Sequence, residues 1–206
     1  MVFVLLLAVT LSSPFAQEVQ DAYAHQKPDR LRSLLSEADA RADSFLVRYR
    51  LYPLTEDASI LDDLPSELPD GSAREIALLS GLWSYRAGEA SFFRKVQYGR
   101  RSANLLEQAK AKDAEDPYVL LVGGQSLLFR PAIAGRDVQK AAACFEQLAT
   151  MADAVGGIPA TEAKVWQWFA LKQDGDVDAA ARLRDRLMSR DPAPLYRQFL
   201  EDPPEI

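Results

Sequence analysis

Four aspartates near the end of the sequence have a spacing similar to that of the ligands in a calcium-binding loop. Asp174, Asp176 and Asp178 alternate along the chain, and Asp185 stands at position twelve when Asp174 is counted as position one. Carboxylates at such positions wrap around Ca²⁺ in EF-hand loops, which also need a glycine at position six. Ala179 stands at that position. A helix turn capped by Asp176 explains the same residues, so we predict no metal site.

The scarcity of cysteine and histidine argues against several other chemistries. The chain has one cysteine, Cys144, and one histidine, His25. A structural zinc site needs about four such ligands, and a disulfide within the chain needs a second cysteine. The sequence also contains no G-x-x-x-x-G-K-[ST] phosphate loop, no H-E-x-x-H motif and no G-x-S-x-G nucleophile elbow. We therefore predict a protein that is not an enzyme and binds no cofactor, with an enzyme based on a carboxylate pair as the less favoured alternative.

Aromatic and basic residues are concentrated between positions 83 and 101. Tyr85, Arg94, Tyr98 and Arg101 are the candidate binding residues. Aromatic rings offer large contact areas, and guanidinium groups pair with carboxylates of a partner. The competing interpretation places the rings in the core and the basic groups on a solvated face.

The spacing of apolar residues predicts helices throughout and no sheet. Apolar side chains recur every three or four positions from about Asp29 to Tyr49, which predicts one helix ending before Pro53. Prolines and carboxylates in residues 53–72 predict an acidic linker, which Ile60 and Leu61 could pin to the body. Glycine and proline breaks, Gly88 among them, separate further helices. These are expected at about 73–86, 92–109, 117–129, 137–155, 161–172, 177–187 and 193–200.

An internal repeat links the later helices. The pattern D-V-x-x-A-A occurs at residues 137–142 and again at 176–181, an offset of 39 residues. The same offset places Leu187 over Leu148 and Leu148 over Ala109. Repeats of this length with two helices per unit are typical of an α-solenoid, in which each helix pair covers the apolar face of the next.

These units resemble the tetratricopeptide repeat (TPR) family over roughly residues 72–195. The sequence departs from the family pattern at Trp168, where a small residue is expected, and at Arg184, where an aromatic is expected. The resemblance implies about three helix–turn–helix units with a concave face for a peptide or partner protein. It is carried by Gly124, Leu127, Gly135, Ala141, Phe145, Gly175, Asp176, Ala180, Asp191 and Pro192, and more weakly by Gly81, Gly88, Leu106 and Ala109.

The first residues are arranged like a secretory signal peptide. An apolar run is followed by Ser12-Ser13-Pro14 and by a small residue, Ala16, after which cleavage is plausible, although no basic residue precedes the run. The run is too short to span a bilayer, and its alternative interpretation is a buried first helix. The expected organisation is a signal peptide at 1–16, an N-terminal helix and acidic linker at 17–71, and a TPR-like domain at 72–206.

The charge of the chain limits its partners. The 206 residues carry a formal net charge of −6, which argues against a general nucleic-acid binder and against adhesion to anionic lipid. The sequence predicts an all-α, exported (periplasmic or secreted) scaffold that binds a peptide or partner protein in a helical-repeat groove. An accessory subunit of an envelope transport or assembly complex is the alternative.

Overall fold

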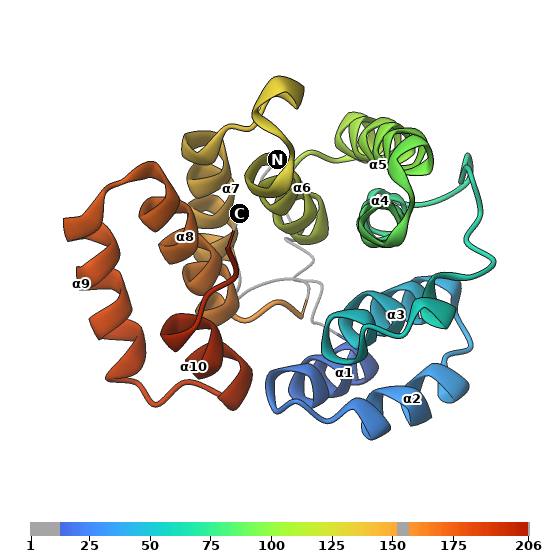
Figure 1. Ribbon diagram of the computed structural model, residues 1–206. Coiled ribbons are helices and arrows are strands. Elements are labelled where there is room, and N and C mark those ends of the chain that lie inside the picture. Colours follow the sequence, from blue (N-terminus) through green and yellow to red (C-terminus); the bar gives the residue numbers. More distant parts are fainter. Residues whose placement is uncertain (1–12, 152–156, 206) are drawn as a thin grey trace, which may run out of the picture.

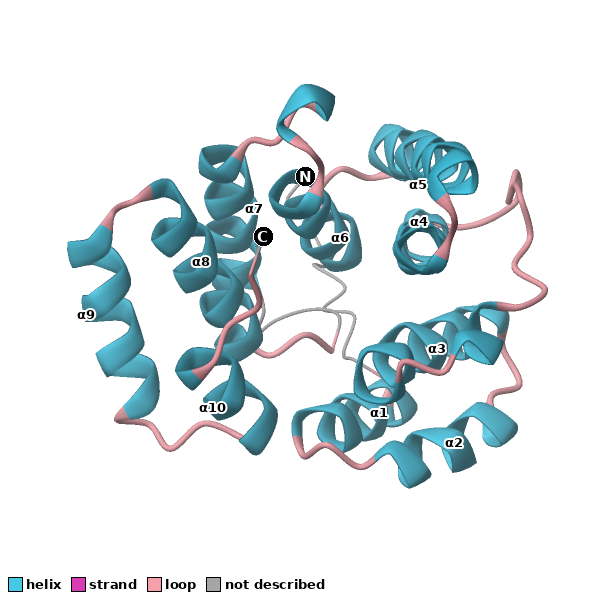
Figure 2. Cartoon of the chain, in the orientation of Figure 1, coloured by secondary structure: helices cyan, strands magenta, loops and turns pink. Residues whose placement is uncertain are grey.

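The structure is a computed structural model that describes residues 13–151 and 157–205. Within these ranges all regular structure is helical and no strand occurs (Figure 2), which confirms the predicted all-α class. The α-helices are α1 (Pro14–Ala24), α2 (Pro28–Glu37), α3 (Arg41–Thr55), α4 (Ala73–Glu89), α5 (Phe92–Lys112), α6 (Pro117–Phe129), α7 (Val138–Met151), α8 (Ala160–Asp174), α9 (Val177–Met188) and α10 (Pro194–Glu201). Two 3₁₀ turns, η1 (Ala58–Leu61) and η2 (Ala132–Ala134), complete the described elements.

The helices pack mostly as sequential pairs that follow one another around a ring (Figure 1). Helix α4 packs against α5, α6 against α7, and α8 against both α7 and α9. The ring closes where α1 meets α10. There the Gln20 side-chain amide donates to the Tyr196 hydroxyl at 2.7 Å, and Gln26 donates to Gln198 at 2.5 Å. The two ends of the described chain are therefore held together by polar side chains.

Local capping explains why the later helices begin where the sequence predicts. Ser72 and Glu75 form a reciprocal capping box at the start of α4. Asp116 accepts from two backbone amides of the first turn of α6, and Asp176 accepts from the Ala179 amide in α9. Gly175 ends α8 in the left-handed conformation at φ +86°. The predicted role of Asp176 as a helix cap is thus confirmed.

The N-terminal quarter differs from the prediction. The single helix expected from Asp29 to Tyr49 is wrong, because extended backbone around residues 38–40 separates α2 from α3. Periodicity missed this break because the apolar spacing continues across it. Pro53 lies inside α3 rather than beyond it, and α1 was not predicted. The predicted stop at Gly88 is also wrong, since α4 continues to Glu89.

Residues 53–72 pack against the rest of the fold, and Ile60 and Leu61 anchor them as predicted. Ile60 is 7% exposed and Leu61 is 2% exposed. Trp83 of α4 donates to the Pro65 carbonyl at 2.9 Å, and Arg86 donates to the Leu61 carbonyl at 2.9 Å. This segment therefore packs along α4 as part of the fold.

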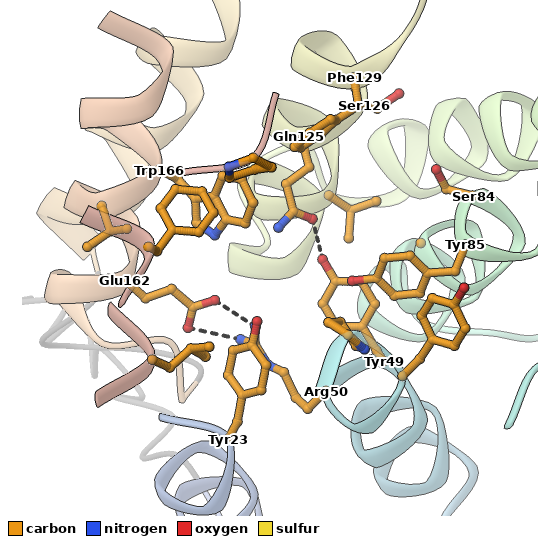
Figure 3. Close-up of a pocket in the computed structure, with 18 of the residues that line it drawn as sticks. Tyr23, Tyr49, Arg50, Ser84, Tyr85, Gln125, Ser126, Phe129, Glu162 and Trp166 are labelled. Carbon is orange, nitrogen blue, oxygen red and sulfur yellow. Dashed lines mark hydrogen bonds and ion pairs between the residues drawn. The ribbon is translucent and has the colours of Figure 1, made fainter. Parts of the chain in front are cut away.

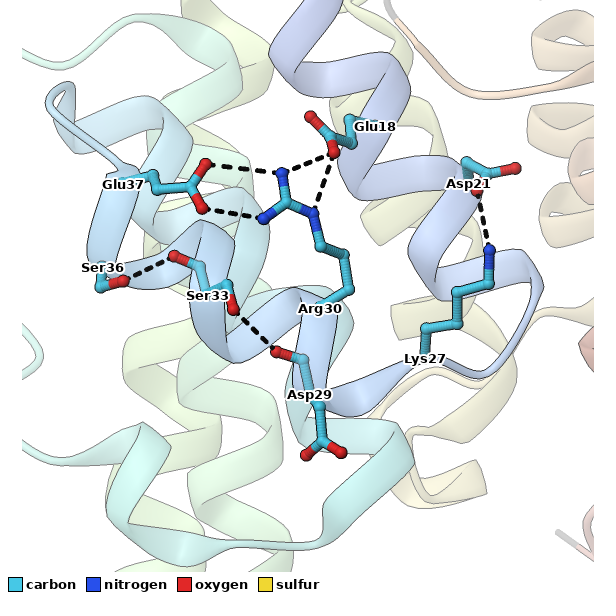
Figure 4. A network of polar contacts seen from close by, with 8 residues as sticks. All are labelled: Glu18, Asp21, Lys27, Asp29, Arg30, Ser33, Ser36 and Glu37. Atoms are coloured by element: carbon cyan, nitrogen blue, oxygen red, sulfur yellow. Dashed lines mark hydrogen bonds and ion pairs between the residues drawn. The ribbon is translucent and has the colours of Figure 1, made fainter.

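An exposed ionic network joins α1 to α2 (Figure 4). Arg30 of α2 donates to Glu18 of α1 at 2.6 and 2.9 Å and to Glu37 at 2.8 Å. All three side chains are at least one-third exposed, so water screens the attraction and the network contributes little stability.

The predicted signal peptide falls mostly on residues 1–12, which lie outside the described residues, as do Val155 and Gly156 at the end of the helix predicted at 137–155. Helix α1 begins at Pro14 and buries Ala16, the expected last residue of that peptide, at 1% exposure. In the described ranges no helix is both long and apolar enough to cross a membrane.

Candidate functional site

A cavity of about 610 Å³ is lined by residues from α1, α3, α4, α5, α6, α8 and α10. Binding sites for small molecules and short segments usually measure roughly 300–1,000 Å³. The cavity therefore has the size of a ligand site, and its lining comes from segments far apart in the sequence.

One wall of the cavity is built from tyrosines (Figure 3). The Tyr85 ring of α4 stacks on Tyr49 and Tyr52 of α3, with centroid separations of 5.5 and 4.8 Å. The Tyr49 hydroxyl donates to the Gln125 side-chain carbonyl of α6. The Tyr52 hydroxyl donates to Glu89 at 2.5 Å. These contacts fix the rings, so this wall is rigid and presents mainly ring surface.

The facing wall carries larger apolar rings. Trp166 of α8 meets Phe199 of α10 edge to face at 5.0 Å and Phe129 of α6 at 6.1 Å. Phe129 is 46% exposed, so this wall reaches solvent. Asp202 and Pro204, which follow α10, also line the cavity. The cavity is therefore open at an edge that includes the C-terminal tail.

A buried ion pair borders the cavity (Figure 3). Arg50 of α3 donates to the two carboxylate oxygens of Glu162 of α8 at 2.6 and 3.1 Å, and each side chain is 2% exposed. Gln20 of α1 donates to Glu162 at 2.8 Å. The Arg50 guanidinium also lies over the Tyr23 ring at 4.7 Å. The ion pair thus connects α3 with α8, and the hydrogen bond of Gln20 adds α1.

The electrostatics favour the charged form of Arg50 and the neutral form of the neighbouring phenols. Burial is the largest single influence and disfavours the Arg50 cation, but the Glu162 carboxylate and the surrounding tyrosines together outweigh it and raise the pKa of Arg50 well above its usual value. Burial raises the pKa of Tyr23 from 10.0 to about 12, against a smaller opposing effect of Arg50. Arg50 Nε has no hydrogen-bond partner among the described residues. The charges of Arg50 and Glu162 therefore cancel, and Arg50 Nε remains as a buried donor without a partner in the described part of the chain.

The raised tyrosine pKa predicts instability at alkaline pH. The unfolded chain releases the Tyr23 proton near pH 10, whereas the folded chain holds it until about pH 12. The contribution of neutral Tyr23 to the free energy of unfolding is therefore complete below pH 10 and is lost as the pH rises from 10 through about 12. Urea midpoints measured from neutral pH upward should fall in this window, and Tyr23→Phe should make the fall shallower. An unchanged midpoint through that window would contradict this assignment.

The predicted binding residues do not form one site. Tyr85 lines the central cavity. Arg94 and Tyr98 line a separate hollow of about 300 Å³ beside α4 and α5. Arg101 lies over the Trp83 ring at 4.6 Å. Arg50 was not predicted as a site residue, and the signal that could have found it is a basic residue within an apolar helical stretch.

The lone cysteine and histidine lie outside the cavity lining. Cys144 on α7 is partly buried, and burial raises the pKa of its thiol, which lowers its reactivity at neutral pH. His25 is exposed and lies 3.1 Å from the Asp21 carboxylate.

No known protein family, curated protein or solved structure matches this chain. Its function must therefore be argued from its own residues.

Proposed function

We propose that this chain is a non-catalytic scaffold that binds a short apolar segment of a partner protein in its central cavity. The observation that carries the proposal is the cavity itself, about 610 Å³ in volume and bordered by two aromatic walls. Rigid rings bind apolar side chains without a large loss of conformational entropy. The proposal assigns the peptide that the sequence predicted for a helical-repeat groove to this one cavity, which is open at one edge.

The polar groups define the part of the ligand that enters. Arg50 and Glu162 neutralise each other, so an unpaired charge on the ligand would find no counterion there. Arg50 Nε has no partner among the described residues, but it is buried, so the surface that a ligand meets is mainly that of the aromatic rings. An uncharged peptide segment with apolar side chains suits such a lining. The mutual pairing also leaves neither group free as an acid, base or nucleophile, which supports a non-catalytic role.

We also propose that the helix pairs from α4 onward are degenerate TPR-like units of a short, strongly curved α-solenoid. The small residues that share the 39-residue register, Ser102, Ala141 and Ala180, are at most 8% exposed. Gly124 of α6 lies against the Phe145 ring of α7, as a small position facing an aromatic requires. Export is part of the same proposal and rests on the apolar N-terminal run.

Blocking the cavity should abolish this binding. Ser84 is exposed and lines the cavity from α4, so Ser84→Trp should fill the cavity and weaken ligand binding at least about tenfold, or ~1.4 kcal/mol. The neutral fluorophore N-phenyl-1-naphthylamine serves as the probe, displaced by acetyl-Leu-Phe-Leu-amide. Ala143→Trp, at an exposed position of α7, is the matched control. Equal binding by both variants, or no displacement by the peptide, would refute the proposal.

A further inference from the structure

The first turns of α5 expose apolar and basic side chains together. Phe92 is 75% exposed, Phe93 is 87% exposed and Val96 is 44% exposed. The two phenyl rings meet edge to face with centroids 5.7 Å apart. Exposed basic side chains occupy the same turns. We define the basic–aromatic patch as Phe92, Phe93, Arg94, Lys95, Val96 and Arg100.

The charges of this patch are not balanced by carboxylates within the same segment of the chain. Residues 91–101 contain four cations and no carboxylate, although the whole chain has a net charge of −6. Among the described residues, Arg94, Lys95 and Arg100 form no ion pair. The fourth cation, Arg101, lies over the Trp83 ring and is not part of the patch. A positive surface therefore stands out on an acidic protein.

Helix stability does not explain these residues. Cations in a first turn oppose the helix dipole, and Ser91 provides no side-chain cap that would offset this. The two phenylalanines bury little surface and so gain little from the hydrophobic effect. Residues that break local rules without compensation within the fold indicate a functional surface.

We propose that the basic–aromatic patch docks the protein on an anionic membrane surface. Exposed phenyl rings enter the boundary between headgroups and acyl chains, while neighbouring cations meet lipid phosphates. The acidic remainder of the chain is repelled by the same surface, which orients the patch toward the lipid. The net charge of −6 therefore opposes adhesion of the protein as a whole and favours adhesion through this edge.

The surroundings of the patch favour lipid over an acidic protein. The rings lie at the start of α5 and line neither of the two cavities described above. The neighbouring hollow of about 300 Å³ carries the carboxylates of Asp62 and Glu89 as well as Arg86 and Arg94. Its charges balance, so it would not select an acidic side chain.

Vesicle co-sedimentation of the full chain tests the proposal. The protein should bind vesicles of equal parts phosphatidylglycerol and phosphatidylcholine, and bind pure phosphatidylcholine far more weakly. Each cation near such a surface contributes about fivefold to partitioning, so Arg94→Gln with Lys95→Gln should lower it roughly 25-fold. Arg182→Gln with Arg190→Gln, which removes two exposed cations elsewhere, should have no such effect. Failure to bind anionic vesicles, or an equal loss in both double variants, would overturn the proposal.

Fluorescence quenching tests whether the phenyl rings of the patch insert into the membrane. Trp in place of Phe93 should be quenched by lipids brominated on their acyl chains, because the side chain enters the membrane. Ala143→Trp, exposed on α7, should not be quenched above the level of the unsubstituted protein. Binding without quenching of Phe93→Trp, or binding to a soluble polyanionic protein but not to vesicles, would also overturn the proposal.

Discussion

Glu162→Gln should lower the free energy of unfolding by about 3–5 kcal/mol, because it leaves the buried Arg50 cation without a counterion. Both side chains are 2% exposed, so water cannot replace the lost carboxylate charge. Arg50 cannot avoid this cost by releasing its proton, since guanidinium groups stay protonated in proteins. Urea denaturation followed by circular dichroism measures the loss.

Two variants separate the buried pair from ion pairs in general. Arg30→Gln removes an exposed network and should cost less than about 1 kcal/mol. Arg50→Met combined with Glu162→Leu removes both buried charges and should recover most of the stability lost in Glu162→Gln. If the double variant were less stable than Glu162→Gln, the isolated charge could not be the cause of the loss.

The helices from residue 72 onward could be predicted because local signals mark their ends. Ser72, Asp116 and Asp176 cap helix starts, and Gly175 ends α8. Each signal acts within a few residues and can be read without the tertiary structure. The break between α2 and α3 has no such marker. Helix α3 begins after Ala40, which has extended backbone and no side chain that could cap the helix, so the sequence does not mark this start.

The candidate site was harder to predict because the closure of the ring assembles it. Arg50 and Glu162 are 112 residues apart, and neither belongs to a motif. Tyr85 was predicted as a binding residue because it belongs to an aromatic cluster, and it lines the cavity. Arg94 and Tyr98 belong to the same stretch of sequence but line another hollow. Periodicity predicts which residues share a helix face, but it does not say which face points inward.

The repeat pattern predicts that Gly124 must be small because α6 packs closely against α7 there. Gly124→Ala should lower the free energy of unfolding by about 2 kcal/mol, although alanine is the better helix former. A Cβ atom there would lie 2.5 Å from Cζ of Phe145, whose side chain is fully buried and has little room to move. The overlap would push α6 away from α7. Urea denaturation of the variant beside the unsubstituted protein measures the cost.

The adjacent glycine supplies the matched control. At Gly123 an added Cβ would meet only the flexible end of Lys110 at 3.9 Å, so Gly123→Ala should stabilise the protein by up to about 1 kcal/mol through helix propensity. Combining Gly124→Ala with Phe145→Leu should cost less than the sum of the two single changes, because the smaller side chain makes room for the new methyl group. Equal effects of alanine at both glycines, or strict additivity with Phe145→Leu, would show that helix propensity rather than close approach to Phe145 governs this position. The tight contact of α6 with α7 would then give no support to a TPR-like unit.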